Sequence, residues 1–137
     1  AIAESLLVMS QLTVPFIAIF IGEGGSGGAL ALAMGNEVWM LENTMYSVLS
    51  PEGFASILWK DSSRSDEAAK VMKLTPDDLF SLDVIDKIIM ETRRKVARKS
   101  DDVMLELKQE LSAKLKELKH LTPAELVEQR QKRFRNY

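Results

Sequence analysis

Cysteine is absent from the 137 residues of this sequence, and histidine occurs once. Without cysteine the chain forms no disulfide and has no cysteine-rich zinc site. A single histidine is too few for a site built from several histidines. We therefore expect no metal in this chain. The formal net charge of −2 argues against a general nucleic-acid-binding protein.

Long apolar runs are missing as well. The longest one near the amino terminus ends at Gly22 and is far shorter than the ~20 residues of a membrane-spanning helix. No secretory signal is visible, so we expect no membrane association and a cytoplasmic location. Residues 1–12 have helical spacing but no capping residue before them. This indicates a fragment, or a domain whose front part lies elsewhere.

Glycine, in contrast, is concentrated in one place. The stretch GEGGSGG at residues 22–28 has five glycines in seven residues. It follows the apolar run 16–21, which is typical of a buried parallel strand, and precedes an alanine-rich helix expected at 28–34. We expect Gly35 and Asn36 to cap that helix. A strand, a glycine loop and a helix start together bring backbone N–H groups to the positive helix end, where an anion is favoured.

The residues leave two chemistries open for this loop. Gly22, Gly24 and Gly27 match the G-x-G-x-x-G of a Rossmann-type dinucleotide-binding module, and Glu42 lies where a ribose-binding acid would be. The short intervening helix argues against that hypothesis, because a crossover between parallel strands is usually longer. The alternative is an oxyanion hole formed by the N–H groups of Gly27 and Gly28. No cysteine or histidine lies nearby, so this chemistry would rely on electrostatics or on a base supplied by the substrate.

The rest of the chain predicts an α/β fold, because strands alternate with helices before helices alone follow. We expect strands at 37–41, 46–49 and 84–89, a polar linker at 62–65, and helices at 54–60, 66–73, 101–119 and 123–135. Val103, Leu107, Leu111, Leu115 and Leu118 would form the apolar stripe of the long helix. Thr75 and Thr122 each precede a proline and stand three residues before an acid, which predicts capped helix starts.

A longer stretch carries a family resemblance. Residues 14–61, which contain the glycine loop, MLEN, YSVLSPEG and ILWKD in this order, closely resemble the carboxyltransferase alpha subunit of bacterial-type acetyl-CoA carboxylase. A weaker likeness continues in LTPDDLFSLDVIDKII and LTPAELVEQRQKRFRNY. The family's front half, with its TPGAYPG-like segment, is not in this sequence. METRRKVARKS stands where a GGAHR-like stretch is expected.

The resemblance implies a partial crotonase (ClpP/crotonase-like) fold with a C-terminal helical extension. Residues 1–90 would be the C-terminal part of the carboxyltransferase core, and residues 91–137 the extension. The implied reaction transfers CO2 from carboxybiotin on a biotin carboxyl carrier protein to acetyl-CoA. Its product is malonyl-CoA, and the step is the first of fatty acid biosynthesis, within a complex that also binds ATP. The implied partner is a carboxyltransferase beta subunit, and we expect an oligomer. A non-catalytic assembly fragment remains an alternative.

The resemblance also implies site residues. Gly27 and Gly28 would form a backbone oxyanion hole for the ureido oxygen of biotin. The expected substrate-binding residues are Gly24, Gly25, Ser26, Tyr46, Ser50, Pro51 and Glu52. Read as local structure instead, Ser26 is a helix cap, and the segment from Tyr46 to Glu52 maintains the fold and builds the wall of the site. Glu23 would form a solvated turn or bond the loop amides rather than act in catalysis.

Overall fold

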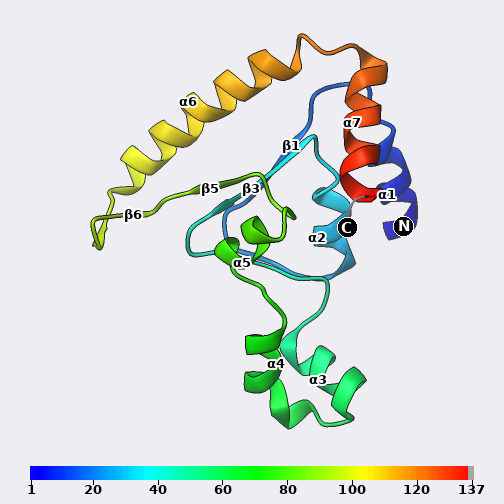
Figure 1. The fold of residues 1–137 in the computed structure, drawn as a ribbon, viewed down its shortest axis with the longest axis vertical. Helices are drawn as coiled ribbons and strands as arrows, with labels where there is room; N and C mark the ends of the chain where they lie inside the picture. Colours follow the sequence, from blue (N-terminus) through cyan, green and yellow to red (C-terminus); the bar gives the residue numbers. More distant parts are fainter. Residues whose placement is uncertain (136–137) are drawn as a thin grey trace.

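A computed structural model describes residues 1–135 as a mixed α/β structure around a small parallel sheet (Figure 1). The sheet consists of β1 (Ile17–Phe20), β3 (Glu37–Leu41) and β5 (Lys87–Ile89), in the order β1–β3–β5. Each strand lies within an apolar run that predicted it, although β5 occupies only the end of the expected range 84–89. All three strands are parallel, so their carboxyl ends meet at one edge of the sheet.

Helices from the amino-terminal part of the chain lie on one face of the sheet. Helix α1 (Ile2–Ser10) lies against α2 (Ser26–Leu32), which connects β1 to β3. The loop from β1 to α2 contains β2 (Glu23–Gly24), which pairs in parallel with β4 (Met45–Tyr46). Of the strand predicted at 46–49, only Tyr46 belongs to β4, and the other residue of β4 is Met45. The predicted helix at 28–34 begins two residues earlier than expected.

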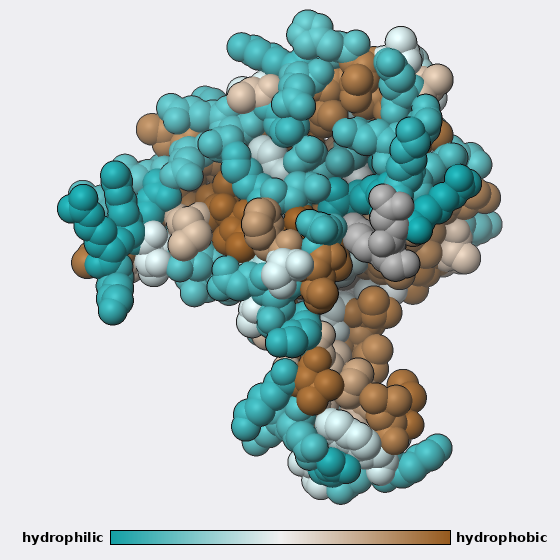
Figure 2. Space-filling view, in the orientation of Figure 1, coloured by the Kyte–Doolittle hydropathy of each residue, from teal (hydrophilic) through white to brown (hydrophobic). Residues whose placement is uncertain are grey.

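A helical arm projects from this body and forms the lower part of Figure 1. It contains α3 (Pro51–Trp59), the 3-10 turn η1 (Ser62–Arg64) and α4 (Ser65–Val71). The ring of Trp59 lies edge-on to Phe54, with ring centroids 5.9 Å apart, and the Arg64 guanidinium lies 4.1 Å above the Trp59 ring. The predicted linker at 62–65 is thus a helical turn within the arm. Figure 2 shows hydrophobic atoms along one side of the arm. In α3 the large apolar residues Ile57 and Leu58 are exposed.

Beyond the arm, α5 (Pro76–Ser81) leads into β5, and two longer helices follow a hairpin. The hairpin pairs β6 (Thr92–Arg93) with β7 (Val96–Ala97). Arg94 and Lys95 both have positive φ angles, 52° and 66°, as a two-residue I′ turn requires. The sequence offers no Asn-Gly or Asp-Gly pair there, so the hairpin was not predicted.

Helix α6 (Ser100–Leu118) covers the second face of the sheet. Its Val103 and Leu107 are buried against Trp39, Leu41 and Ile89, while Leu111 packs at the margin of this cluster. Leu118 is also buried, which confirms the predicted apolar stripe of this helix. The opposite face of β3 contributes to a separate cluster of buried residues, which consists of Ala18, Ala33, Val38, Met40, Tyr46, Leu79 and Ile85.

The capped helix starts are confirmed at both threonines. Thr75 Oγ1 accepts the N–H of Asp78 at 3.3 Å. Before α7 (Pro123–Arg135), the Thr122 N–H donates to Glu125 Oε2 at 2.7 Å, and the Glu125 N–H donates to Thr122 Oγ1 at 3.3 Å. The hydrogen bonds from the Thr122 backbone and side chain hold the pKa of Glu125 below its ordinary value. Residues 136–137 of the expected helical extension lie outside the described residues.

The predicted cap at Gly35 and Asn36 is wrong, because α2 ends at Leu32 and its C-cap is Ala33. None of the described glycines has a positive φ. At Gly35 a Cβ atom would instead lie 2.6 Å from the Glu37 carbonyl oxygen and 3.0 Å from that of Phe16. Glycine is needed here because the chain passes between the starts of β1 and β3 with no room for a side chain.

Asn36 joins this turn to the last helix. Its Nδ2 donates to the Leu126 carbonyl at 3.0 Å and to Gln129 Oε1 at 2.8 Å. Its Oδ1 accepts from the Phe16 N–H and from Arg130 Nη1, at 3.2 and 3.3 Å. Asn36 is 3% exposed, so each of these bonds satisfies a polar group that water does not reach. The amide of one residue thus fastens α7 to the amino ends of β1 and β3.

A second link ties α7 to the amino end of β5. Arg133 forms an ion pair with Asp86, and its Nη2 donates to the Val84 carbonyl at 2.7 Å. The same Asp86 carboxylate accepts the backbone N–H of Val38 at 2.7 Å. Helix α7 therefore bonds to the amino-terminal side of all three sheet strands, although it is the last element of the chain.

Candidate functional site

The glycine loop lies at the carboxyl end of β1, and the chain turns into α2 at Ser26. Gly25 is extended, with φ −116° and ψ 161°, and is the N-cap of α2. Ser26 follows with a φ of 73°, in the left-handed region that non-glycine residues rarely adopt. Its Oγ accepts the Gly28 N–H at 3.3 Å. The interpretation of Ser26 as the helix cap is therefore wrong in position, yet its side chain does bond the first turn of α2.

Most of the loop backbone has open space where a side chain would be. A Cβ atom at Gly22 or Gly25 would meet nothing within 4 Å, and at Gly28 only Ser26 Oγ at 3.6 Å. At Gly27 it would meet the side chain of Ile2 at 3.4 Å, which is ordinary contact with α1. The first N–H groups of a helix have no acceptor within the helix. The backbone of Gly22 and Gly25 thus has open space beside it, whereas Gly27 contacts Ile2 and the Gly28 N–H already donates to Ser26 Oγ.

Gly24 differs from its neighbours, because its missing side chain makes room for an aromatic ring. A Cβ atom there would lie 2.1 Å from the Phe20 ring. That ring stacks on Tyr46 with centroids 4.3 Å apart, and Tyr46 is the residue paired with Gly24 between β2 and β4. Tyr46 is buried in the apolar core by this arrangement. Tyr46 and Gly24 therefore build the wall behind the loop.

A pocket of about 340 Å³, which we call the loop pocket, brings two distant segments together. Five of the predicted substrate-binding residues line it: Gly24, Gly25, Ser26, Ser50 and Pro51. The remaining lining residues are Glu23, Met45, Ser47, Leu49 and Leu74. The other predicted site residues do not line it. Gly27 and Gly28 lie in the first turn of α2, Tyr46 lies in β4 and lines a separate apolar cavity, and Glu52 lies in the first turn of α3.

The second side of the loop pocket is fixed by a serine turn that the sequence did not reveal. Ser47 Oγ accepts the Leu49 N–H at 3.2 Å and also donates to the Leu49 carbonyl. Three residues later, Ser50 Oγ accepts the Gly53 N–H at 3.1 Å and so caps α3, with Pro51 at its first position. The predicted helix at 54–60 therefore begins earlier, at Pro51. A serine before a proline was the available signal for this start.

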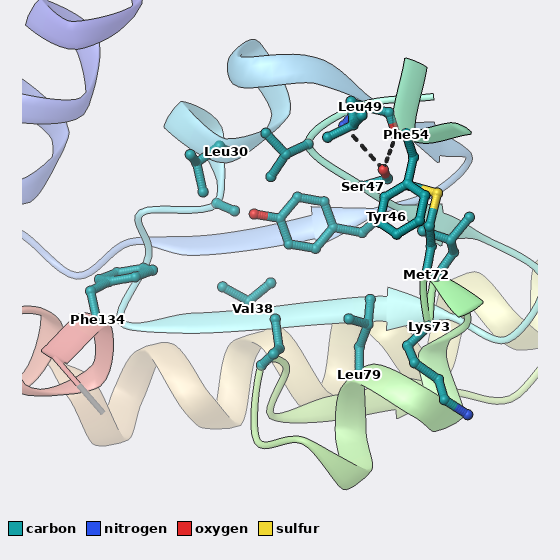
Figure 3. A pocket seen from close by; sticks show the side chains of 14 residues that line it. Leu30, Val38, Tyr46, Ser47, Leu49, Phe54, Met72, Lys73, Leu79 and Phe134 are labelled. Atoms are coloured by element: carbon teal, nitrogen blue, oxygen red, sulfur yellow. Dashed lines mark hydrogen bonds between the residues drawn. The ribbon is translucent and has the colours of Figure 1, made fainter. Parts of the chain in front are cut away.

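Behind the loop pocket lies an apolar cavity of about 370 Å³ (Figure 3). Ser47, Leu49 and Leu74 line both spaces. The cavity extends from there past Tyr46 and Val38 toward Phe134 of α7, as the close-up shows. The polar turn of Ser47 thus stands between a space lined by glycine backbone and a space lined by hydrocarbon.

Glu42, the acid required by the dinucleotide hypothesis, has another role. Its carboxylate accepts the N–H groups of Glu91 and Thr92 at 2.7 and 2.6 Å and the Thr92 hydroxyl at 2.6 Å. These bonds, led by that of the Thr92 side chain, lower the pKa of Glu42 from its ordinary 4.5. The carboxylate fastens β6 to the end of β3, so it is already satisfied. The crossover length, however, was a wrong argument against a dinucleotide site. The whole connection between the adjacent parallel strands β1 and β3 runs over residues 21–36, which is long enough for a crossover.

The described residues contain neither a metal-ligand cluster nor a membrane-spanning helix. Within residues 1–135 no three side chains of His, Cys, Asp or Glu are grouped as metal ligands would be. None of the described helices combines the length and the apolar character needed to cross a bilayer.

Comparison with solved structures gives the fold. The chain superposes on a Pseudomonas malonate decarboxylase, solved as a hetero-tetramer with coenzyme A, with a TM-score of 0.68. The sequences are 20% identical over 85% of this chain and 47% of that one. The 12S transcarboxylase hexamer superposes with a TM-score of 0.56 at 20% identity, over 65% of this chain and 19% of that one. The fold is thus the crotonase-like fold of carboxyltransferases and decarboxylases, as expected.

The sequence comparison is more specific. The family model for acetyl co-enzyme A carboxylase carboxyltransferase-like proteins matches residues 1–137, and the chain belongs to this family. It is 56% identical over its whole length to the acetyl-coenzyme A carboxylase carboxyl transferase subunit alpha of Streptococcus gordonii, and 55% identical to that of Streptococcus pneumoniae. The chain spans 52% of the length of each of these relatives.

Proposed function

We propose that this chain is the part of a carboxyltransferase alpha subunit that holds carboxybiotin during transfer of its CO2 to acetyl-CoA. The loop pocket is the observation that carries this proposal, since the open backbone of Gly25 and the fixed turn at Ser50 and Pro51 line it together. Membership of the family supports it. The partners would be a carboxyltransferase beta subunit and a biotin carboxyl carrier protein, and the product would be malonyl-CoA.

In the proposed reaction the glycine loop acts electrostatically. The N–C bond of carboxybiotin breaks, negative charge develops on the ureido oxygen, and a C–C bond forms between CO2 and the acetyl methyl carbon. The N–H groups of Gly27 and Gly28 would donate to that oxygen at the start of α2. The 3.3 Å bond from the Gly28 N–H to Ser26 Oγ is long and would be exchanged for the stronger bond to an oxyanion.

No side chain is proposed as the base. Among the ten residues that line the loop pocket, Glu23 alone carries a carboxyl or amino group. The methyl proton of acetyl-CoA would therefore pass to the ureido nitrogen, which becomes free when CO2 leaves. Gly24, Gly25, Ser26, Ser50 and Pro51 would surround the biotin rings, while Tyr46 and Glu52 would support this surface from behind.

The test is Gly28→Val in a full-length alpha subunit that carries this sequence, reconstituted with its beta subunit. Valine keeps the backbone N–H of residue 28 but places a branched Cβ where the oxygen would approach, so this donor is blocked. Loss of one oxyanion donor typically lowers kcat about 10²–10³-fold, or about 3–4 kcal/mol. We expect this loss with little change in the KM for acetyl-CoA and with the fold retained, because the space beyond Gly28 is open. Gly22→Ala is the matched control. A Gly28→Val complex that carboxylates acetyl-CoA at the parent rate would show that the loop glycines serve packing only.

A further inference from the structure

The hairpin of β6 and β7 carries an exposed cluster of cations. We call residues 92–97 the basic hairpin, because they contain Arg93, Arg94 and Lys95 and no acidic residue. All three residues are exposed, and within residues 1–135 none of their side chains forms a hydrogen bond or an ion pair. The whole chain has a formal net charge of −2, so the rest of it is acidic. An acidic partner is therefore attracted at this hairpin and repelled by the remaining net charge.

The acidic residues beside the basic hairpin are occupied at its base. The Glu42 carboxylate accepts the N–H and the hydroxyl of Thr92, both at 2.6 Å. Glu91 Oε2 accepts the N–H and the Nδ2 of Asn43, at 2.8 and 3.0 Å. Both carboxylates thus fasten the base of the hairpin to the end of β3. They hold the ribbon in place without pairing with the cations at its tip.

The turn of the basic hairpin consists of long cationic residues, although its geometry favours others. Arg94 and Lys95 have φ angles of 52° and 66°. A turn with two left-handed residues is usually made by Asn-Gly or Asp-Gly. Backbone strain of this kind persists where the surrounding structure enforces it, and it is concentrated at functional sites. The two cations at the turn are therefore better explained by the use of their charge than by the stability of the hairpin.

The basic hairpin leaves the sheet at the edge where the glycine loop lies. Strands β1, β3 and β5 are parallel, the loop follows the carboxyl end of β1, and the hairpin follows that of β5 after two residues. Neighbouring strands are about 4.8 Å apart, so the ends of β1 and β5 are separated by about 10 Å. Figure 1 shows the hairpin extending from β5 on the side away from α7. A molecule that enters the loop pocket thus approaches the edge that also bears the hairpin.

The surroundings of these cations fit a protein surface better than a small molecule. Small-molecule sites are concave. Neither the loop pocket nor the apolar cavity behind it includes a residue of the basic hairpin. Figure 2 shows mostly hydrophilic atoms over the projecting end that Figure 1 labels β6. A projecting ribbon with charges of one sign is suited to an oppositely charged protein face.

We infer that the basic hairpin binds an acidic face of the biotin carboxyl carrier protein while the biotin of that protein occupies the loop pocket. This inference rests on the proposed function, because biotin then reaches the pocket attached to a lysine of its carrier. The carrier surface around that lysine stays outside the pocket and meets the elements at its edge. Complementary charge there steers and orients the carrier, so the hairpin acts on association and not on the breaking of bonds.

A comparison of tethered and free biotin isolates this role. A full-length alpha subunit that carries this sequence is reconstituted with its beta subunit. CO2 transfer from malonyl-CoA is measured to the biotin of the carrier protein and to biocytin, which is biotin on free lysine. Arg94→Glu/Lys95→Glu reverses both charges of the turn. At low ionic strength we expect kcat/KM for the carrier to fall about tenfold or more, and the values for biocytin and malonyl-CoA to stay within about twofold. The Kd of the carrier, measured by surface plasmon resonance on the immobilised complex, should rise by the same factor.

A matched control changes the same amount of charge elsewhere. Lys108→Glu/Lys116→Glu alters two exposed lysines of α6 and should leave the carrier kinetics unchanged. Added salt should lower kcat/KM of the parent toward that of the hairpin variant, because screening removes the steering. Circular dichroism verifies that each variant folds. If Arg94→Glu/Lys95→Glu does not fold, Arg94→Gln/Lys95→Gln, which retains unbranched side chains at the turn, decides by the same comparison.

Four results would overturn the inference. The first is an unchanged Kd and kcat/KM for the carrier in the hairpin variant, and the second is an equal loss in the α6 control. The third is an equal loss for the carrier and for biocytin, which would assign the hairpin to the structure of the loop pocket. The fourth is a raised KM for malonyl-CoA with unchanged carrier kinetics, since the hairpin would then bind the phosphates of coenzyme A. Transfer to biocytin by the parent, and its loss in Gly28→Val, test the proposed function separately.

Discussion

The two ends of the parallel sheet are built in opposite ways. At the amino end, Asn36 and Asp86 bond α7 to all three strands, and the Gly35 turn has no free volume. At the carboxyl end of β1, the glycine loop borders the loop pocket, and Gly22 and Gly25 have empty space beside them. In open α/β sheets, ligands bind outside the carboxyl ends of the strands. The difference indicates that one end provides stability and the other is left accessible for binding.

Glycine illustrates the difference most directly. Gly35 is required because backbone oxygens occupy the position of its Cβ, whereas Gly22, Gly25 and Gly28 have no such obstruction. A glycine without local need still costs folding entropy. Gly22, Gly25 and Gly28 are therefore explained better by the approach of a ligand than by packing, while Gly24 and Gly35 are explained by packing.

The largest expected effect on stability is that of Gly35→Ala. Its Cβ would lie 2.6 Å from the Glu37 oxygen, and both nearest groups are backbone, so β1 and β3 must move apart. Overpacking of this kind costs about 1–3 kcal/mol, and we expect the upper end of that range. Urea unfolding of the parent and the variant measures it. A loss below about 0.5 kcal/mol would contradict the rigid amino end.

Glu42→Gln tests a side-chain connection at the carboxyl end of β3. The glutamine amide accepts fewer hydrogen bonds than the carboxylate that binds Glu91 and Thr92, so the variant should be less stable at pH 7. A lowered folded-state pKa means that Glu42 stabilises the protein above about pH 4.5 and that this contribution is lost as the pH falls through the lowered pKa.

The difference in the free energy of unfolding between parent and Glu42→Gln should therefore shrink on acidification. Urea melts at pH 7 and at successively lower pH values measure it. Glu23→Gln is the control, because the described structure gives the Glu23 side chain no hydrogen bond or ion pair, and this variant should show no comparable trend. A constant difference at every pH would mean that the Thr92 contacts are not formed.

The smallest expected effect has the opposite sign. Gly22→Ala adds a methyl group where no atom lies within 4 Å and where φ is not positive. Such a substitution restricts the unfolded chain and stabilises the fold by about 0.4–1 kcal/mol. Thermal unfolding should show a small increase in Tm. A decrease would indicate that the loop is packed as tightly as the Gly35 turn, and the contrast between the two ends would fail.

Much of the fold could be predicted from local sequence. The apolar runs before Gly22 and before Asn43 predicted β1 and β3, and the threonine–proline starts predicted α5 and α7. These features depend on residues within one or two turns of each other, so their physical causes are visible in the sequence. The hairpin at Arg94 and Lys95 was missed because neither residue is a typical I′ turn former.

The candidate site was predicted in part. The glycine loop and the segment at Ser50 and Pro51 were both identified, and the structure places both beside the loop pocket. Ser47 and Leu49 were expected only as part of the wall-building segment from Tyr46 to Glu52, and Leu74 was not identified, because their place in the lining depends on the turn of β4 into α3 and on the end of the arm. Glu42 was assigned to a ligand by spacing alone, although its acceptor groups are taken by Thr92 and Glu91.

Local sequence was enough for the strand–loop–helix unit around residues 16–32, for the helix starts at Thr75 and Thr122 and for the family, because each rests on the identity and order of neighbouring residues. Only the tertiary structure shows that Gly35 is crowded, that the Glu42 carboxylate already has its hydrogen-bond donors, and that α7 bonds to the amino end of the sheet. Those outcomes depend on contacts such as Asn36 with Leu126, across 90 residues of chain, where packing and desolvation outweigh any local preference.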